Sequence, residues 1–226
     1  MSEDYIIRMI RQFTGVLARI IGLKNEGQYQ EALKEIDQSL ELFFGMDAEL
    51  IKSLDDESLY AILMKNEALD VKKPGYIAYL FKEAGDTYKL QNQNFESINS
   101  YLHALHFSLK MSNLTETALP PEISQMIDEL LQNLGTYPLE ENTLWDLFCL
   151  YENEKEFAKA DQMLRRLTAR IDTRANAVDE MKSFYKRLLE KSDKELAAGG
   201  MSQAGIQKKL KEIDMINWEF PKTTFE

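Results

Sequence analysis

The chain is poor in cysteine, proline and glycine, and each shortage excludes a class of protein. A single cysteine, Cys149, rules out an intramolecular disulfide and therefore a disulfide-stapled secreted scaffold. Five prolines and ten glycines in 226 residues are too few for a collagen-like or low-complexity chain. The apolar opening stretch is interrupted by Arg8, Arg11 and Arg19, which a membrane-spanning helix would resist. We expect a cytoplasmic protein with no membrane segment.

Charge is unevenly distributed and makes nucleic acid an unfavourable partner. The net charge is −11, and residues 1–153 hold 12 basic against 25 acidic side chains. Residues 154–226 hold 15 basic and 13 acidic side chains. An acidic body repels a phosphate backbone, so we expect no nucleic acid partner.

Apolar residues recur every three to four positions along almost the whole chain, which predicts an all-α fold. No run of strict alternation is long enough for a strand. The prolines at 120–121 mark a candidate sub-boundary near 113–121, but both sides look helical and we expect one domain, 1–226. The predicted helices are 3–24, 28–44, 47–53, 56–69, 75–91, 94–112, 121–134, 141–153, 156–172, 175–196 and 202–214.

Residues 81–105 contain the clearest internal repeat. A small residue at Gly85 would let a second helix approach the first, and Tyr88 and Tyr101 would fill the space between them. The pattern resembles the tetratricopeptide helix-turn-helix, although Leu109 replaces the family's closing proline. The residues in the pattern are Phe81, Ala84, Gly85, Tyr88, Phe95, Tyr101, Ala104 and Leu105.

Two weaker copies lie in the same phase, in residues 16–40 and 144–167. The positions equivalent to Gly85 are Ile20 and Phe148, which lie 65 residues before and 63 residues after it. Each separation is close to two tetratricopeptide lengths, and degenerate units near 46–69 and 121–134 would fill the gaps. The resemblance implies antiparallel helix pairs in a tetratricopeptide-like right-handed array, and the bulky Ile20 and Phe148 predict that this array is irregular.

A second resemblance involves the segments 4–13 and 27–33, which read DYIIRMIRQF and GQYQEAL. They resemble an uncharacterised family of Firmicute proteins known only as a domain of unknown function. That resemblance implies a bacterial cytoplasmic protein with a tetratricopeptide-like fold, and it implies no activity.

No residue pattern points to catalysis, a metal or a cofactor. The only histidines, His103 and His106, share a helix face but lack a third ligand nearby in the sequence. Cys149 has apolar neighbours and no cation to lower its pKa, and Gly199-Gly200 lacks the lysine of a phosphate loop. We therefore expect a protein that is not an enzyme.

The repeat register predicts a binding groove along the first helix of each pair. Its residues would be Tyr79, Lys82, Asp86 and Lys89 in the clearest unit and Asn142, Trp145, Cys149 and Glu152 in the later one. The leading hypothesis is a non-enzymatic scaffold that binds a protein or peptide there. One alternative is a small-ligand sensor or enzyme with a pocket between helices. Another is a homo-oligomer joined through the first helix or through an apolar C-terminal tail, whose aromatic residues are Trp218, Phe220 and Phe225.

Overall fold

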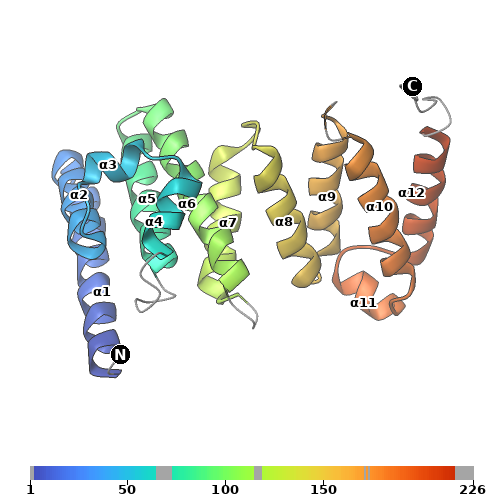
Figure 1. Cartoon of the computed structure of the whole chain (residues 1–226), viewed down its shortest axis with the longest axis horizontal. Coiled ribbons are helices and arrows are strands. Elements are labelled where there is room, and N and C mark those ends of the chain that lie inside the picture. The colour runs from blue at the N-terminus through green and yellow to red at the C-terminus, as the bar shows by residue number, and fades with distance from the viewer. Residues whose placement is uncertain (1–2, 65–72, 115–118, 171, 173, 217–226) are drawn as a thin grey trace. The chain divides into compact units, whose positions relative to one another are not determined.

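The computed structural model describes residues 3–64, 73–114, 119–170, 172 and 174–216. Every regular element within these ranges is an α-helix, which confirms the all-α prediction (Figure 1). None of the described helices is long and apolar enough to cross a membrane. The helices are α1 (Glu3–Asn25), α2 (Tyr29–Phe44), α3 (Ala48–Ser53), α4 (Asp56–Met64), α5 (Lys73–Leu90), α6 (Asn94–Leu114), α7 (Pro121–Leu134), α8 (Glu141–Asn153), α9 (Phe157–Thr168), α10 (Arg174–Leu189), α11 (Asp193–Ala198) and α12 (Gln203–Ile216).

The helices form two compact units, which we call unit 1 (Met1–Tyr137) and unit 2 (Pro138–Glu226). Unit 1 contains α1 to α7 and unit 2 contains α8 to α12. Pro121 begins α7 inside unit 1, at a position where proline's missing N–H costs nothing. The prediction of a single domain over 1–226 stays a prediction.

Three helix pairs, α1–α2, α5–α6 and α8–α9, are joined by the same turn. Its key residue adopts a positive φ, which is 75° at Gly27, 60° at Asn92 and 62° at Lys155. The next N–H in each turn donates to the carbonyl five residues earlier, at 2.8 to 2.9 Å. The turns are 65 and 63 residues apart, so the backbone repeats in the phase that the sequence pattern indicates.

The shared turn corrects the register at one residue of the pattern. Counted from the positive-φ residue, Asn94 and not Phe95 is equivalent to the fully buried Phe157. Phe95 is equivalent to the exposed Ala158, and its side chain is 80% exposed. Phe95 is therefore one residue out of register with the position that the pattern assigned to it.

The close approach of α5 and α6 depends on Gly85. A Cβ at this position would lie 2.6 Å from the Tyr101 ring, closer than carbon atoms can pack. Tyr101 is buried, and the Ser97 hydroxyl donates to the Gly85 carbonyl at 2.9 Å. Unit 1 thus has the tight helix pair that the sequence predicts around Gly85.

The predicted helix 175–196 is wrong because the chain breaks it after Leu189. α10 ends there, and α11 begins after Ser192, whose side chain caps the Glu195 N–H while Glu195 reaches back to the Ser192 N–H. This capping box is visible in the sequence as Ser-Asp-Lys-Glu at 192–195.

Within the described residues, the degenerate unit expected near 46–69 does not separate α2 from α5. α5 packs directly on α1 and α2, while α3 lies against α2 and α4 lies against α6. α7 packs on α6 as a single helix within unit 1. The part of the predicted helix 56–69 that follows Met64 lies outside the described residues. The same is true of Trp218, Phe220 and Phe225 in the proposed tail interface.

Candidate functional site

The predicted groove residues of α5 are paired with one another and with neighbouring helices. Lys82 Nζ lies 3.1 Å from an Asp86 carboxylate oxygen and 3.4 Å from a Glu129 oxygen on α7. Lys89 donates to the Asn133 side chain, also on α7, at 2.8 Å. The charges that were expected to face a partner thus stabilise contacts inside unit 1.

The ion pairs extend from α5 to α1 and α6. The Lys24 ammonium pairs with Glu83 and lies 3.6 Å from Asp86, and all three side chains are at least three-quarters buried. Asp86 also accepts a 2.8 Å hydrogen bond from the Tyr101 hydroxyl. Burial and this carboxylate raise the pKa of Tyr101, so the phenol stays protonated as the donor.

Tyr79, the remaining predicted residue of α5, is half-buried and packs edge-on against Phe13 with ring centroids 6.3 Å apart. Burial and the Glu122 carboxylate raise its pKa. A Lys82→Glu substitution would place a carboxylate beside Asp86 and Glu129. If that variant lost binding, the cause could be a damaged binding surface or a destabilised fold. A role for these residues in recognition therefore stays a prediction.

In unit 2 the predicted groove residues lie along α8. Asn142 is exposed, whereas Trp145 is half-buried, with its ring edge-on to Phe148 at 6.0 Å and its Nε1 3.4 Å from Glu141. Glu152 accepts two hydrogen bonds from Arg187 of α10, at 2.9 and 3.0 Å.

Cys149 is exposed on α8, and its thiol is not activated. The side chain is only partly exposed, and partial burial of the sulfur together with the nearby carboxylates of Asp146 and Glu152 raises the pKa of Cys149. A raised pKa lowers the thiolate fraction, which is the nucleophilic form.

The two histidines join α6 to α4. His103 Nδ1 lies 2.5 Å from an Asp56 carboxylate oxygen, and its Nε2 lies 3.3 Å from the Asn99 amide nitrogen. This arrangement fits an Nδ1–H that donates to Asp56 and an Nε2 that accepts from Asn99. His106 lies 3.9 Å from both Asp56 and Glu57. No set of three or more metal-ligating side chains gathers within the described ranges.

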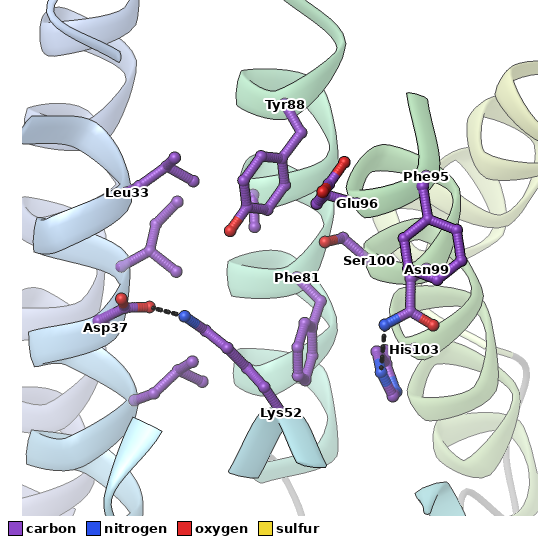
Figure 2. A pocket seen from close by; sticks show the side chains of 13 residues that line it. Leu33, Asp37, Lys52, Phe81, Tyr88, Phe95, Glu96, Asn99, Ser100 and His103 are labelled. Carbon is purple, nitrogen blue, oxygen red and sulfur yellow. Dashed lines mark hydrogen bonds and ion pairs between the residues drawn. The ribbon is translucent and has the colours of Figure 1, made fainter. Parts of the chain in front are cut away.

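Unit 1 contains a cavity of about 170 Å³ between α2, α3, α5 and α6, which we call the unit 1 cavity (Figure 2). Figure 2 shows Leu33 on one side facing the aromatic rings of Tyr88 and Phe81 on α5. Its apolar lining is Leu33, Ile36, Leu40, Phe81, Ala84 and Phe95, and its polar lining is Asp37, Lys52, Tyr88, Glu96, Asn99, Ser100 and His103.

The segment 45–64 borders the cavity through α3. α3 and α4 pack against α2 and α6 and do not supply a full helix pair between them. The cavity lies where α2 and α6 flank α5 without closing on each other, and only Lys52 reaches it from α3. Lys52 is held by Asp37 at 2.7 Å and by Glu49 at 3.2 Å.

Carboxylates dominate the electrostatics of the unit 1 cavity. Burial raises the pKa of Tyr88, Lys52 opposes the rise, and Asp37, Glu96 and Glu49 add to it. Asp37 is neutralised by Lys52. The Glu96 carboxylate is exposed and has no ion pair or hydrogen bond among the residues that the structure describes. The cavity therefore has a free negative charge at its edge.

Sequence reasoning missed this cavity because its lining comes from four helices. The only signal was local: Phe95 lies three residues after the turn residue Asn92, where a polar side chain would be usual. With the register counted from the positive-φ residue, Phe95 falls on the outside of the pair and marks the exposed edge.

Unit 2 contains a buried carboxylate, Asp161, that joins three helices. It accepts hydrogen bonds from Tyr185 of α10, from Lys209 of α12 at 2.7 Å and from Arg165 of α9 at 2.9 Å. Burial alone would raise the pKa of Asp161, but these donors outweigh it and hold the pKa below its usual range. Because its donors satisfy this carboxylate, we assign it a structural role.

Comparison with known proteins gives one assignment. No curated protein and no solved structure matches the chain. The model of one family, described as a family of unknown function (DUF6483), matches residues 1–217. The match spans nearly the entire chain, and the protein therefore belongs to this family.

Proposed function

We propose that the protein is a non-catalytic scaffold that holds a short segment of a partner protein against unit 1, with one side chain of that segment in the unit 1 cavity. The observation that supports the proposal is the cavity itself, beside which Phe95 is 80% exposed. An engineered apolar cavity of about 150 Å³ binds benzene, so about 170 Å³ suits one ring-sized side chain.

The exposed aromatic ring supports a protein or peptide as the ligand. Aromatic side chains are favoured anchors at interfaces, where they bury a large area with few rotamers to fix. Phe95 lies next to cavity residues on α6 and is free of packing inside the helix pair. A partner segment would cover this ring while one of its own side chains fills the cavity.

The proposal includes a tetratricopeptide-like right-handed arrangement of the helix pairs. The repeated turn at Gly27, Asn92 and Lys155 supports it, since a regular turn gives successive pairs the same geometry. The proposal also places the protein in the bacterial cytoplasm, where the low cysteine content would be ordinary.

The test is selection of random displayed peptides on the full-length protein, followed by affinity measurements on three variants. Phe95→Ala should weaken the selected peptides at least about tenfold without loss of stability, because the ring is exposed. Ala84→Leu should abolish binding by filling the cavity. Leu42→Ala is the control, because it removes another exposed apolar side chain, 62% exposed, that does not line the cavity.

Two results would overturn the proposal. One is that no peptide is enriched over a surface without protein. The other is that the enriched peptides bind wild type and Phe95→Ala equally, which would place their site elsewhere.

A second candidate function is a small-ligand sensor, and the polar lining of the same cavity favours it. Seven of its lining residues are polar or charged, a mixture that can orient a small molecule. A thermal-shift screen of metabolites separates the two functions. A small molecule that stabilises wild type but not Ala84→Leu would favour the sensor.

A further inference from the structure

The chemistry of the unit 1 cavity points to one class of occupant, and this step rests on the function proposed above. We propose that the cavity binds a ring-sized apolar group joined to a protonated amine or guanidinium. The apolar group would lie among Ile36, Leu40 and Phe81, and the cation would lie at Glu96.

The apolar half of the site is built by two helices that face each other. Ile36 and Leu40 of α2 are at most 1% exposed, and Phe81 of α5 is 3% exposed. All three line the cavity, and the Phe81 ring is held by stacking on His103, with centroids 4.7 Å apart. These fixed walls give an apolar group a preformed place, so little ordering cost remains on binding.

The cationic half of the site follows from its unbalanced charge. Lys52, the one cation of the lining, is already held by Asp37 and Glu49, while Glu96 has no partner among the described side chains. Glu96 directly follows Phe95 in the sequence, and Figure 2 shows it between the side chains of two lining aromatics, Phe95 and Tyr88. A carboxylate with aromatic faces around it favours an organic cation.

The charge of unit 1 as a whole supports the same occupant. Residues 1–137 contain 12 lysines and arginines against 21 aspartates and glutamates, a net charge of −9. This field attracts cations to the surface and repels carboxylate ligands. An anionic occupant with the same ring is therefore repelled both by Glu96 and by the net negative charge of unit 1.

Glu96 also has a structural role that the test must separate. It lies in the first turn of α6, where a carboxylate stabilises the helix N-terminus. Glu31 has the same position in α2 and is likewise exposed, with no partner among the described side chains. Glu31→Gln is therefore a matched control for Glu96→Gln, since both remove one charge and one first-turn carboxylate.

In the experiment, the full-length protein is titrated with three probes that share one ring, and binding of each probe is monitored by NMR. The probes are 2-phenylethylamine, 2-phenylethanol and 3-phenylpropionate, which are cationic, neutral and anionic at pH 7. We expect the amine to bind about fivefold tighter than the alcohol, and the carboxylate to bind weakest. Glu96→Gln should remove the amine's advantage and leave the alcohol unchanged, whereas Glu31→Gln should change neither.

Further arms locate the probe and identify the source of the cation. Ala84→Leu should abolish binding of the amine, and Phe95→Ala should weaken it while the protein stays folded. The capped peptide acetyl-Gly-Phe-Arg-Gly-amide presents the same chemistry from a protein. Tighter binding of this peptide than of the amine assigns the site to a partner segment, and the reverse assigns it to a free amine.

The inference is overturned if the three probes bind equally, if none binds, or if Glu96→Gln and Glu31→Gln have the same effect. These failures differ from failure of the proposed function. Displayed peptides that need Phe95 but contain no basic residue would keep the scaffold and refute the cationic occupant. Amine binding at Glu96 without any cavity-dependent peptide would do the opposite.

Discussion

At the scale of single residues, the close contact at Gly85 shows how the absence of a Cβ atom sets the spacing of two helices. Alanine is the better helix former by about 1 kcal/mol, so a glycine kept inside α5 must be explained by packing. The Tyr101 ring occupies the space of the missing Cβ, and its hydroxyl is held by Asp86.

We predict that Gly85→Ala lowers the free energy of unfolding by about 1–2 kcal/mol, because overpacking outweighs the gain in helix propensity. Chemical denaturation of the two proteins measures the difference. Gly15→Ala is the control, since a Cβ at this helical position meets no atom within 4 Å and should stabilise by about 0.5–1 kcal/mol. A stabilising Gly85→Ala would contradict the packing argument.

Lys155 occupies the strained position of its turn with φ 62°. Lys155→Gly should raise the free energy of unfolding by about 0.5–1 kcal/mol, since glycine adopts this conformation without a Cβ clash. Asn92→Gly should gain less, because asparagine tolerates the left-handed region better than lysine. Equal gains at the two positions, measured by denaturant titration, would show that side-chain identity does not decide the turn's stability.

At the scale of the elements, the sequence predicted most helices because the apolar period and the turn residues agree along much of the chain. It failed at 190–192, where the apolar spacing hides a break that only the Ser192 capping box reveals. It also failed to place α3 and α4, because periodicity identifies a helix and says little about which helix covers it.

The candidate site was harder to predict for the same reason. Lys82 and Asp86 pair with each other on α5, but their other partners, Lys24 and Glu129, lie on other helices and far away in sequence. The unit 1 cavity depends on where α2 and α6 fail to meet, which no local pattern encodes.

Asp161 permits a prediction about helix packing in unit 2. Its lowered pKa means that its stabilising effect is complete above its ordinary pKa and is lost as the pH falls through the lower pKa of the folded state. Asp161→Asn should cost about 1–3 kcal/mol at pH 7, because the donors of Lys209 and Tyr185 lose a charged acceptor. The cost should shrink towards pH 3, where the wild-type carboxyl also begins to protonate.

Circular dichroism of thermal unfolding across pH 3–7 measures this change. Asp179→Asn, at an exposed position of α10, is the control and should have little effect at any pH. A pH-independent loss in Asp161→Asn would refute the electrostatic explanation and favour a steric one.

At the scale of the whole molecule, each unit has its own apolar core. Tyr101 and Phe107 are fully buried in unit 1, and Phe157 and Phe184 are fully buried in unit 2. Exposed residues 135–138 connect the units. Two cores joined in this way are expected to lose structure separately when one is weakened.

We predict that Gly85→Ala and Asp161→Asn destabilise different parts of the chain. Hydrogen exchange should accelerate in α5 and α6 for the first variant and in α9, α10 and α12 for the second, because each change disrupts one unit's core. Acceleration across both units in either variant would show that the chain unfolds as a single cooperative body.

The shared turn also has a kinetic consequence. Because each turn brings together helices adjacent in sequence, most pairing requires little loop closure, and such low contact order is typical of folding within about microseconds to milliseconds. The docking of α5 on α1 and α2 is different, since the chain must first span residues 45–72. During synthesis, we therefore expect α1 and α2 to form a helical hairpin first. The apolar surface that α5 covers in the folded protein would stay exposed until α5 has left the ribosome.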